Sequence, residues 1–152
     1  VLYLLGVLHP GAGLAPGLVG YAPALYQALH QAIRQGLVRA CHDLSEGGLA
    51  VAAAEMCIGG RLGLALEIPY PSQALFAAAN ACLLAEIRPG QCSAFETLLT
   101  GLPHERLGQV TAEPRLVVEL PSPEQAESTR AGISLPVSAL VAAWKSNLGK
   151  PG

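Results

Sequence analysis

The chain has 152 residues, of which 51% are hydrophobic and 13% charged, with a formal net charge of −2 at pH 7. This length suits a single domain with a sizeable core, and the composition excludes a disordered chain. Aromatic residues make up only 5% and no basic stripe is present, which argues against nucleic-acid binding. No apolar run approaches the ~20 residues of a membrane span. The low charge leaves two interpretations open: a surface covered by another domain or subunit, or an alanine-rich soluble protein.

The first residues, Val1 to Gly6, read as the inside of a strand, without an initiator Met or the basic segment of a signal peptide. We therefore expect residues 1–152 to be one domain, cut from a longer cytoplasmic chain. The cysteines are Cys41, Cys57, Cys82 and Cys92. None has CxxC spacing, so we expect free structural thiols and no zinc site.

The pattern of apolar residues, Gly and Pro predicts short strands interspersed with helices. Strands are expected at 2–8, 38–41, 64–68, 83–87, 107–110 and 116–120. Helices are expected at 23–35, 49–58, 93–99 and 138–148, with Gly59 and Gly60 ending the second. Segments 9–20 and 121–129 are expected to be loops, and 75–81 is ambiguous. Because the strands are short and unevenly separated, we predict an α+β domain with a mixed sheet packed with helices.

A dense polar segment, His42 to Gly48, lies between the second strand and the second helix. Asp43 and Ser45 are types that cap helix N-termini, and we expect the helix to begin around Glu46. Glycines let a ligand approach the backbone, and the helix start adds N–H donors and partial positive charge. These features favour a phosphate- or substrate-binding site formed by His42, Asp43, Ser45, Glu46, Gly47 and Gly48. A well-capped helix with glycines packed against a strand is the simpler alternative.

Groups for binding Mg-ATP are scarce. Asp43 is the only aspartate, and the only lysines are Lys145 and Lys150. Because a protein that binds Mg-ATP unaided needs carboxylates for the metal and cations for the phosphates, we expect that, if this chain handles a nucleotide, it does so with help from another domain. No residue is assigned a catalytic or metal-binding role.

Some other polar and aromatic residues are expected to be structural. The histidines outside the polar segment lack a partner four residues away, which argues against metal binding; they are His9, His30 and His104. Glu55 could cap the helix or pair with Arg61, and a solvated or structural role is expected for it. Trp144 is expected to anchor the last helix in the core.

Residues 40–56, ACHDLSEGGLAVAAAEM, closely resemble the HDLSEGGLAVALAEM stretch of the phosphoribosylformylglycinamidine synthase family. Weaker similarity extends over most of the chain, at 36–39, 63–67, 106–110 and 134–144. The resemblance implies the C-terminal domain of a superfamily that also includes aminoimidazole ribonucleotide synthetase, selenophosphate synthetase, thiamine-phosphate kinase and a hydrogenase-maturation protein. The long GLAVA–AEM match argues for the purine enzyme over other ATP-dependent members.

The resemblance implies a ligase of purine biosynthesis. In that family, ATP phosphorylates the formamide oxygen of formylglycinamide ribonucleotide, and glutamine-derived ammonia displaces phosphate to give the amidine. ATP and Mg²⁺ would serve the full enzyme, with none bound tightly by this domain alone. The implied partners are the N-terminal synthetase domain and a glutaminase domain or subunit, and a homodimer is left open. The isolated domain is expected to be inactive.

Two departures from the family pattern favour a second interpretation. Residues 76–82 read FAAANAC where the family carries FxES-x-x-R, and residues 9–14 read HPGAGL in place of a glycine- and glutamate-rich loop. The alternative is therefore a non-catalytic copy that packs, dimerises or retains a nucleotide. In long forms of the enzyme the synthetase unit is duplicated, and one copy holds a structural nucleotide.

Overall fold

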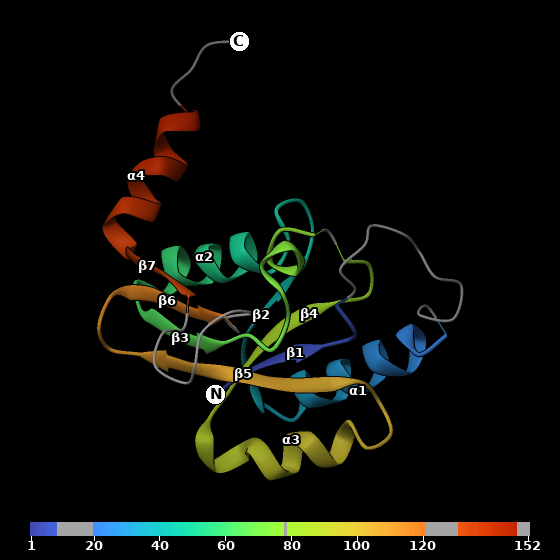
Figure 1. Ribbon diagram of the computed structural model, residues 1–152. Coiled ribbons are helices and arrows are strands. Elements are labelled where there is room, and N and C mark those ends of the chain that lie inside the picture. Colours follow the sequence, from blue (N-terminus) through green and yellow to red (C-terminus); the bar gives the residue numbers. More distant parts are fainter. Residues whose placement is uncertain (9–19, 78, 121–130, 149–152) are drawn as a thin grey trace.

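The computed structural model describes residues 1–8, 20–77, 79–120 and 131–148. Within them, one seven-stranded sheet has the order β2-β4-β1-β5-β3-β6-β7 (Figure 1). The strands are β1 (Leu2–Leu5), β2 (Val38–Asp43), β3 (Gly63–Glu67), β4 (Leu83–Ile87), β5 (His104–Thr111), β6 (Arg115–Leu120) and β7 (Ala131–Pro136). The helices are α1 (Ala22–Arg34), α2 (Gly48–Gly60), α3 (Cys92–Leu98) and α4 (Val137–Leu148), with short 3-10 segments η1 (Ser72–Leu75) and η2 (Pro89–Gln91).

The sheet is mixed. The pair β3 and β6 is parallel, and the other neighbouring strands pair antiparallel. Helices α2 and α4 cover one face and α1 and α3 the other (Figure 1). The predicted α+β class is therefore confirmed.

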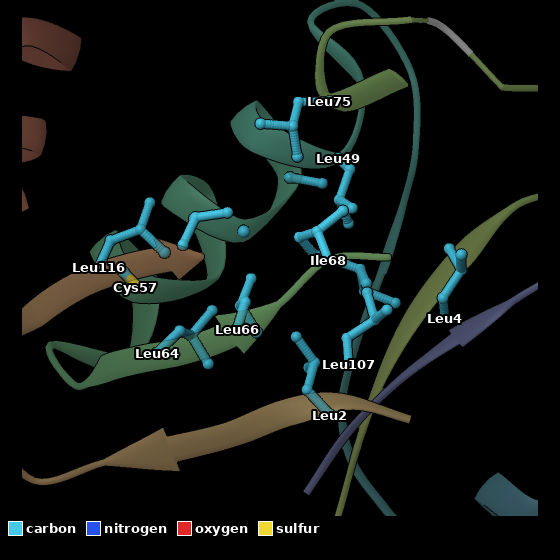
Figure 2. Close-up of a cluster of buried hydrophobic side chains, with 14 of the residues drawn as sticks. Leu2, Leu4, Leu49, Cys57, Leu64, Leu66, Ile68, Leu75, Leu107 and Leu116 are labelled. Carbon is cyan, nitrogen blue, oxygen red and sulfur yellow. The ribbon is translucent and has the colours of Figure 1, made fainter. Parts of the chain in front are cut away.

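Strand β1 is buried on both faces because it lies in the interior of the sheet. Leu2 and Leu4 belong to the core beneath α2 (Figure 2), whereas Tyr3 and Leu5 belong to the core beneath α1 and α3. This alternation follows from the two-residue period of a strand. It explains why the segment reads as a continuous apolar run and not as alternating apolar and polar residues.

Gly108 allows β5 to approach β3 closely. A Cβ atom at Gly108 would lie 2.0 Å from the carbonyl oxygen of Ala65. At the same place the β1–β5 register shifts, between Leu2 and Tyr3. A bulge of this type changes the direction of the strand. The close approach of the β3 backbone leaves no room for a side chain at Gly108.

Several element boundaries differ from the sequence predictions. Strand β1 ends at Leu5 and not near residue 8, and β5 begins at His104, before the predicted 107. Helix α2 continues through Gly60, and Arg61 adopts the left-handed conformation that ends it (φ 54°). The ambiguous segment 75–81 begins at the end of η1, and β7 was not predicted.

Trp144 is not a core residue: 48% of its surface is exposed. Val137 and Val141, nearer the start of α4, pack into the α2 core. The later turns of α4 extend away from the sheet (Figure 1), so the tryptophan has no core to enter. The predicted loops at 9–20 and 121–129 fall, apart from Gly20, outside the described residues. No helix in the described ranges is long and apolar enough to cross a membrane.

Candidate functional site

The polar segment spans the last two residues of β2, an edge strand of the sheet, the turn that follows and the first residue of α2. The helix begins at Gly48, one residue before the start of the predicted range 49–58 and two residues after Glu46, and Gly47 is its N-cap. Asp43 and Ser45, the residue types suited to capping, do not cap the helix: among the described residues, neither side chain bonds its first turn. Two consecutive left-handed glycines, at φ 83° and 60°, make the reversal instead.

A backbone hydrogen bond closes this turn. The N–H of Gly48 donates to the carbonyl of Ser45 at 3.0 Å, and the N–H of Val51 donates to that of Gly47 at 3.4 Å. The first-turn N–H groups of Leu49 and Ala50 precede any intrahelical acceptor. Leu49 is only 1% exposed, whereas Ala50 is partly exposed. Among the described residues of this turn, the Ala50 amide is therefore the backbone donor that can face a ligand.

The segment after η1 packs directly on the start of α2. A Cβ atom at Gly48 would lie 2.5 Å from the carbonyl oxygen of Ala77 and 2.8 Å from that of Leu75. Figure 2 shows Leu75 and Leu49 together at this end of the helix. The glycine therefore permits close packing, as the simpler interpretation held, but its neighbour is a 3-10 segment and not a strand.

His42 is directed at α2. Its Nε2 lies 3.0 Å from a carboxylate oxygen of Glu55, and its Nδ1 lies 2.7 Å from the backbone carbonyl of Asp43. The Asp43 carboxylate is further away, at 3.7 Å from Nδ1. Glu55 thus pairs with His42, and the pair with Arg61 that the sequence also allowed is not found among the described residues. The sequence signal for this contact was the alternation of side chains along β2. That alternation places His42, opposite Leu84, on the sheet face that α2 covers.

The outward surface of the turn is polar on one side and apolar on the other. Asp43, Ser45 and Glu46 are exposed, whereas Leu44 is buried and anchors the turn. Beside the helix start, Phe76 is 58% exposed. It is the first residue of the 76–82 segment, where the family pattern has acidic, hydroxyl and basic side chains.

The described residues offer no group of three or more His, Cys, Asp or Glu side chains placed to hold a metal ion. His30 is exposed on α1, and Nδ1 of His104 lies 2.9 Å from the carbonyl of Leu102. His9 lies outside the described residues. These positions agree with structural or solvated histidines.

The cysteines are free thiols, as predicted. Cys57 and Cys82 are buried in the α2 core, Cys92 is partly exposed and Cys41 is exposed. Burial raises the pKa of the Cys57 thiol to about 11. A thiol in this state is protonated and a poor nucleophile, which suits a structural role.

Comparison with known proteins identifies the family. Residues 16–121 match the family described as AIR synthase related protein, C-terminal domain. The PurL subunit of phosphoribosylformylglycinamidine synthase from Lactobacillus helveticus is 35% identical over 121 residues, covering 79% of this chain and 15% of that protein. The subunit from Synechocystis sp. is 35% identical over 156 residues, covering 97% of this chain and 20% of that protein.

The chain therefore spans only 15% and 20% of the length of these two relatives. Among solved structures, Thermotoga maritima PurL complexed with ATP superposes with a TM-score of 0.73 at 19% identity, over 92% of this chain and 25% of that one. This likeness supports the fold. The family match covers well over half of the sequence, and the chain belongs to the AIR synthase related protein family as a C-terminal domain.

Proposed function

We propose that the chain works as a domain of a phosphoribosylformylglycinamidine synthase. That enzyme would convert formylglycinamide ribonucleotide, ATP and glutamine-derived ammonia to the amidine, ADP and phosphate. The observation that carries the proposal is the 35% identity to a PurL subunit over 97% of this chain. The motif HDLSEGG at residues 42–48 adds to it, since it lies at a strand-to-helix turn with exposed polar side chains.

In this proposal His42, Asp43, Ser45, Glu46, Gly47 and Gly48 form one wall of the substrate cleft. The exposed Ser45 hydroxyl and the N–H group of the partly exposed Ala50 can donate to phosphate oxygens. Asp43 and Glu46 repel a bare phosphate, so their partner is a magnesium ion or a substrate amide. His42 and Gly48 hold the turn in place.

We assign Mg-ATP binding largely to a partner domain, in keeping with the scarcity of aspartate and lysine in this sequence. Mg-ATP supplies the phosphoryl group when it is bound in the full enzyme. The described residues bring no three metal-binding side chains together, so we assign most metal and phosphate contacts to an N-terminal synthetase domain. A glutaminase domain or subunit would supply ammonia, and the enzyme would be cytoplasmic. The isolated chain is then expected to be inactive.

A specific observation favours a second candidate, a non-catalytic copy of the same domain. The first residues of the 76–82 segment, Phe76 and Ala77, lie against Gly48 through their backbone. The ring of Phe76 is exposed, and the sequence of the segment carries alanines, Asn80 and Cys82 in place of acidic, hydroxyl and basic groups. In this case the domain packs against its partner or retains a nucleotide without turnover.

A chimera tests both candidates. The segment of the Lactobacillus helveticus subunit that aligns with this chain is replaced by this chain, and ATP-dependent amidine formation is measured with its glutaminase. Turnover is expected, with Ser45→Ala lowering kcat/KM at least about tenfold, or about 1.4 kcal/mol. His30→Ala, an exposed change on α1, is the matched control and should have no effect.

A folded chimera without turnover contradicts the first candidate. A second chimera, with the FxES-x-x-R residues restored at 76–82, then separates the remaining options. Recovered turnover would support the non-catalytic copy. If neither folded chimera turns over substrate or retains ATP, both candidates are contradicted: the chain would then be neither a catalytic domain of this enzyme nor a non-catalytic copy of it.

A further inference from the structure

A cavity of about 250 Å³ lies between the second half of α2 and the end of the sheet that includes β2. Apolar side chains form most of its wall, among them Ala40, Met56, Leu64 and Val110. The α2 wall includes two glycines, Gly59 and Gly60. A Cβ atom at either position would meet nothing within 4 Å, which agrees with open space at this end of the helix.

One carboxylate, that of Glu86, faces this apolar space. Glu86 pairs with Leu2 of β1 across the sheet and lies on the same face as Leu84, which belongs to the α2 core. Its side chain is only 16% exposed. A carboxylate in such surroundings is costly unless a cation or hydrogen-bond donors compensate it.

The compensation within the chain is weak. Arg39 contacts one oxygen of Glu86 at 3.5 Å, and the arginine side chain is 51% exposed. Over the described ranges, the Glu86 carboxylate has no other ion pair or hydrogen bond. An ion pair at this distance with a half-exposed partner contributes little. The cavity wall therefore carries a carboxylate whose one cation partner among the described residues is a half-exposed arginine, which leaves it able to pair with a bound cation.

Two other groups on α2 add negative potential. The last turn of the helix borders the cavity through Gly60, and its carbonyl end carries a partial negative charge. No basic side chain lies in that turn. Glu55 is 3.0 Å from His42, whose ring also lines the cavity.

We propose that this cavity binds a small organic cation, a primary ammonium on a short apolar body. The ammonium would donate to the Glu86 carboxylate, and the apolar part would contact Met56, Leu64 and Val110. The volume lies below the ~300 Å³ of sites for drug-sized ligands and above the ~150 Å³ that holds benzene. One ring with an aminomethyl group is therefore of the right size. The inference is independent of the purine-enzyme proposal.

The test compares two probes of equal shape by ¹H–¹⁵N NMR titration of the 152-residue chain at pH 7. Benzylamine carries the ammonium, and benzyl alcohol is its neutral counterpart. Benzylamine is expected to shift the amides of Ala40, Cys57, Gly59 and Gly60 saturably, with a Kd in the millimolar range. Benzyl alcohol should bind at least about tenfold more weakly, since it cannot pair with a carboxylate.

Variants locate the charge and the cavity. Glu86→Gln should remove the preference for benzylamine, whereas Glu113→Gln, an exposed carboxylate paired with Arg115, should keep it. Ala40→Phe should fill the cavity and weaken both probes. Equal binding of the two probes by the unmodified chain would overturn the proposal without any variant. So would shifts confined to residues outside the cavity, or a preference that survives in Glu86→Gln.

Discussion

The imidazole of His42 lies 3.0 Å from the carboxylate of Glu55, so the penultimate residue of β2 contacts the middle of α2. The pair spans the turn that separates the two elements. It fixes how the strand end and the helix start are oriented, which in turn sets where Ser45 and Glu46 face solvent. Both side chains are partly exposed, at 27% and 40%.

A double-mutant cycle measures this contact. His42→Ala and Glu55→Gln should each lower the free energy of unfolding, and their effects should be non-additive by about 0.2–1 kcal/mol, the range of exposed ion pairs. Urea unfolding of the four proteins gives the coupling energy. Replacing His30 in place of His42 is the matched control, since it is exposed on α1. Strict additivity of His42 and Glu55 would show that the pair does not couple the turn to the helix.

The last helix offers a comparison of two side chains on one element. Val141→Ala should lower the free energy of unfolding by about 1–2 kcal/mol, because Val141 is buried in the α2 core. Trp144→Ala should change it by less than about 0.5 kcal/mol, because half of the indole is exposed. Thermal or urea unfolding checks both. A larger loss for Trp144 would place the indole in the core after all.

Tyr3 makes the stability depend on alkaline pH. Its ring is buried against Phe95, and its hydroxyl donates to Glu96 at 2.6 Å. Burial, with help from this hydrogen bond, raises the pKa of Tyr3 far above its usual range. Above pH ~10 the unfolded chain releases the tyrosine proton while the folded chain keeps it, so stability falls as pH rises.

The expected slope from Tyr3 is up to about 1.4 kcal/mol per pH unit above pH ~10. Tyr3→Phe should flatten the fall between pH 10 and 12, although it costs about 1 kcal/mol at neutral pH through the lost hydrogen bond. Tyr26→Phe, at an exposed tyrosine on α1, should leave the slope unchanged. Melting temperatures measured across this pH range give the slopes. A Tyr3→Phe slope equal to that of the unmodified chain would contradict the assignment.

The local elements of the fold could be predicted because their signals are local. The strands at 38–41, 83–87 and 116–120 all fall within observed strands. Strand β7 was missed because Gly132 and Pro136 weaken its pattern, and it is stabilised by pairing with β6. The sheet order also has no local signal: β1 lies between β4 and β5, although both follow it far along the chain.

The candidate site divides in the same way. The strand–turn–helix could be located from the motif, because the polar residues and glycines that indicate the turn are contiguous in sequence. The role of its glycines depends on the segment 75–77, which is distant in sequence and packs on the helix start. The partner of His42 likewise depends on how α2 lies over the sheet. Capping by Asp43 or Ser45 was the expected choice, and the double glycine reversal replaced it.

Gly48 gives the sharpest test of this packing. Its φ of +60° is unfavourable for any side chain, by about 1–2 kcal/mol. An added Cβ would also meet the backbone of Ala77 and Phe76 at 2.5 and 2.9 Å, and backbone cannot rotate away. Gly48→Ala should therefore lower the free energy of unfolding by at least about 2 kcal/mol without any ligand, and Gly48→Val by more. Gly59→Ala is the matched control in the same helix, where a Cβ meets nothing within 4 Å and a gain of about 0.5–1 kcal/mol is expected. An unchanged melting temperature for Gly48→Ala would mean that the 3-10 segment does not pack on the helix, and the glycine would then serve a ligand and not the fold.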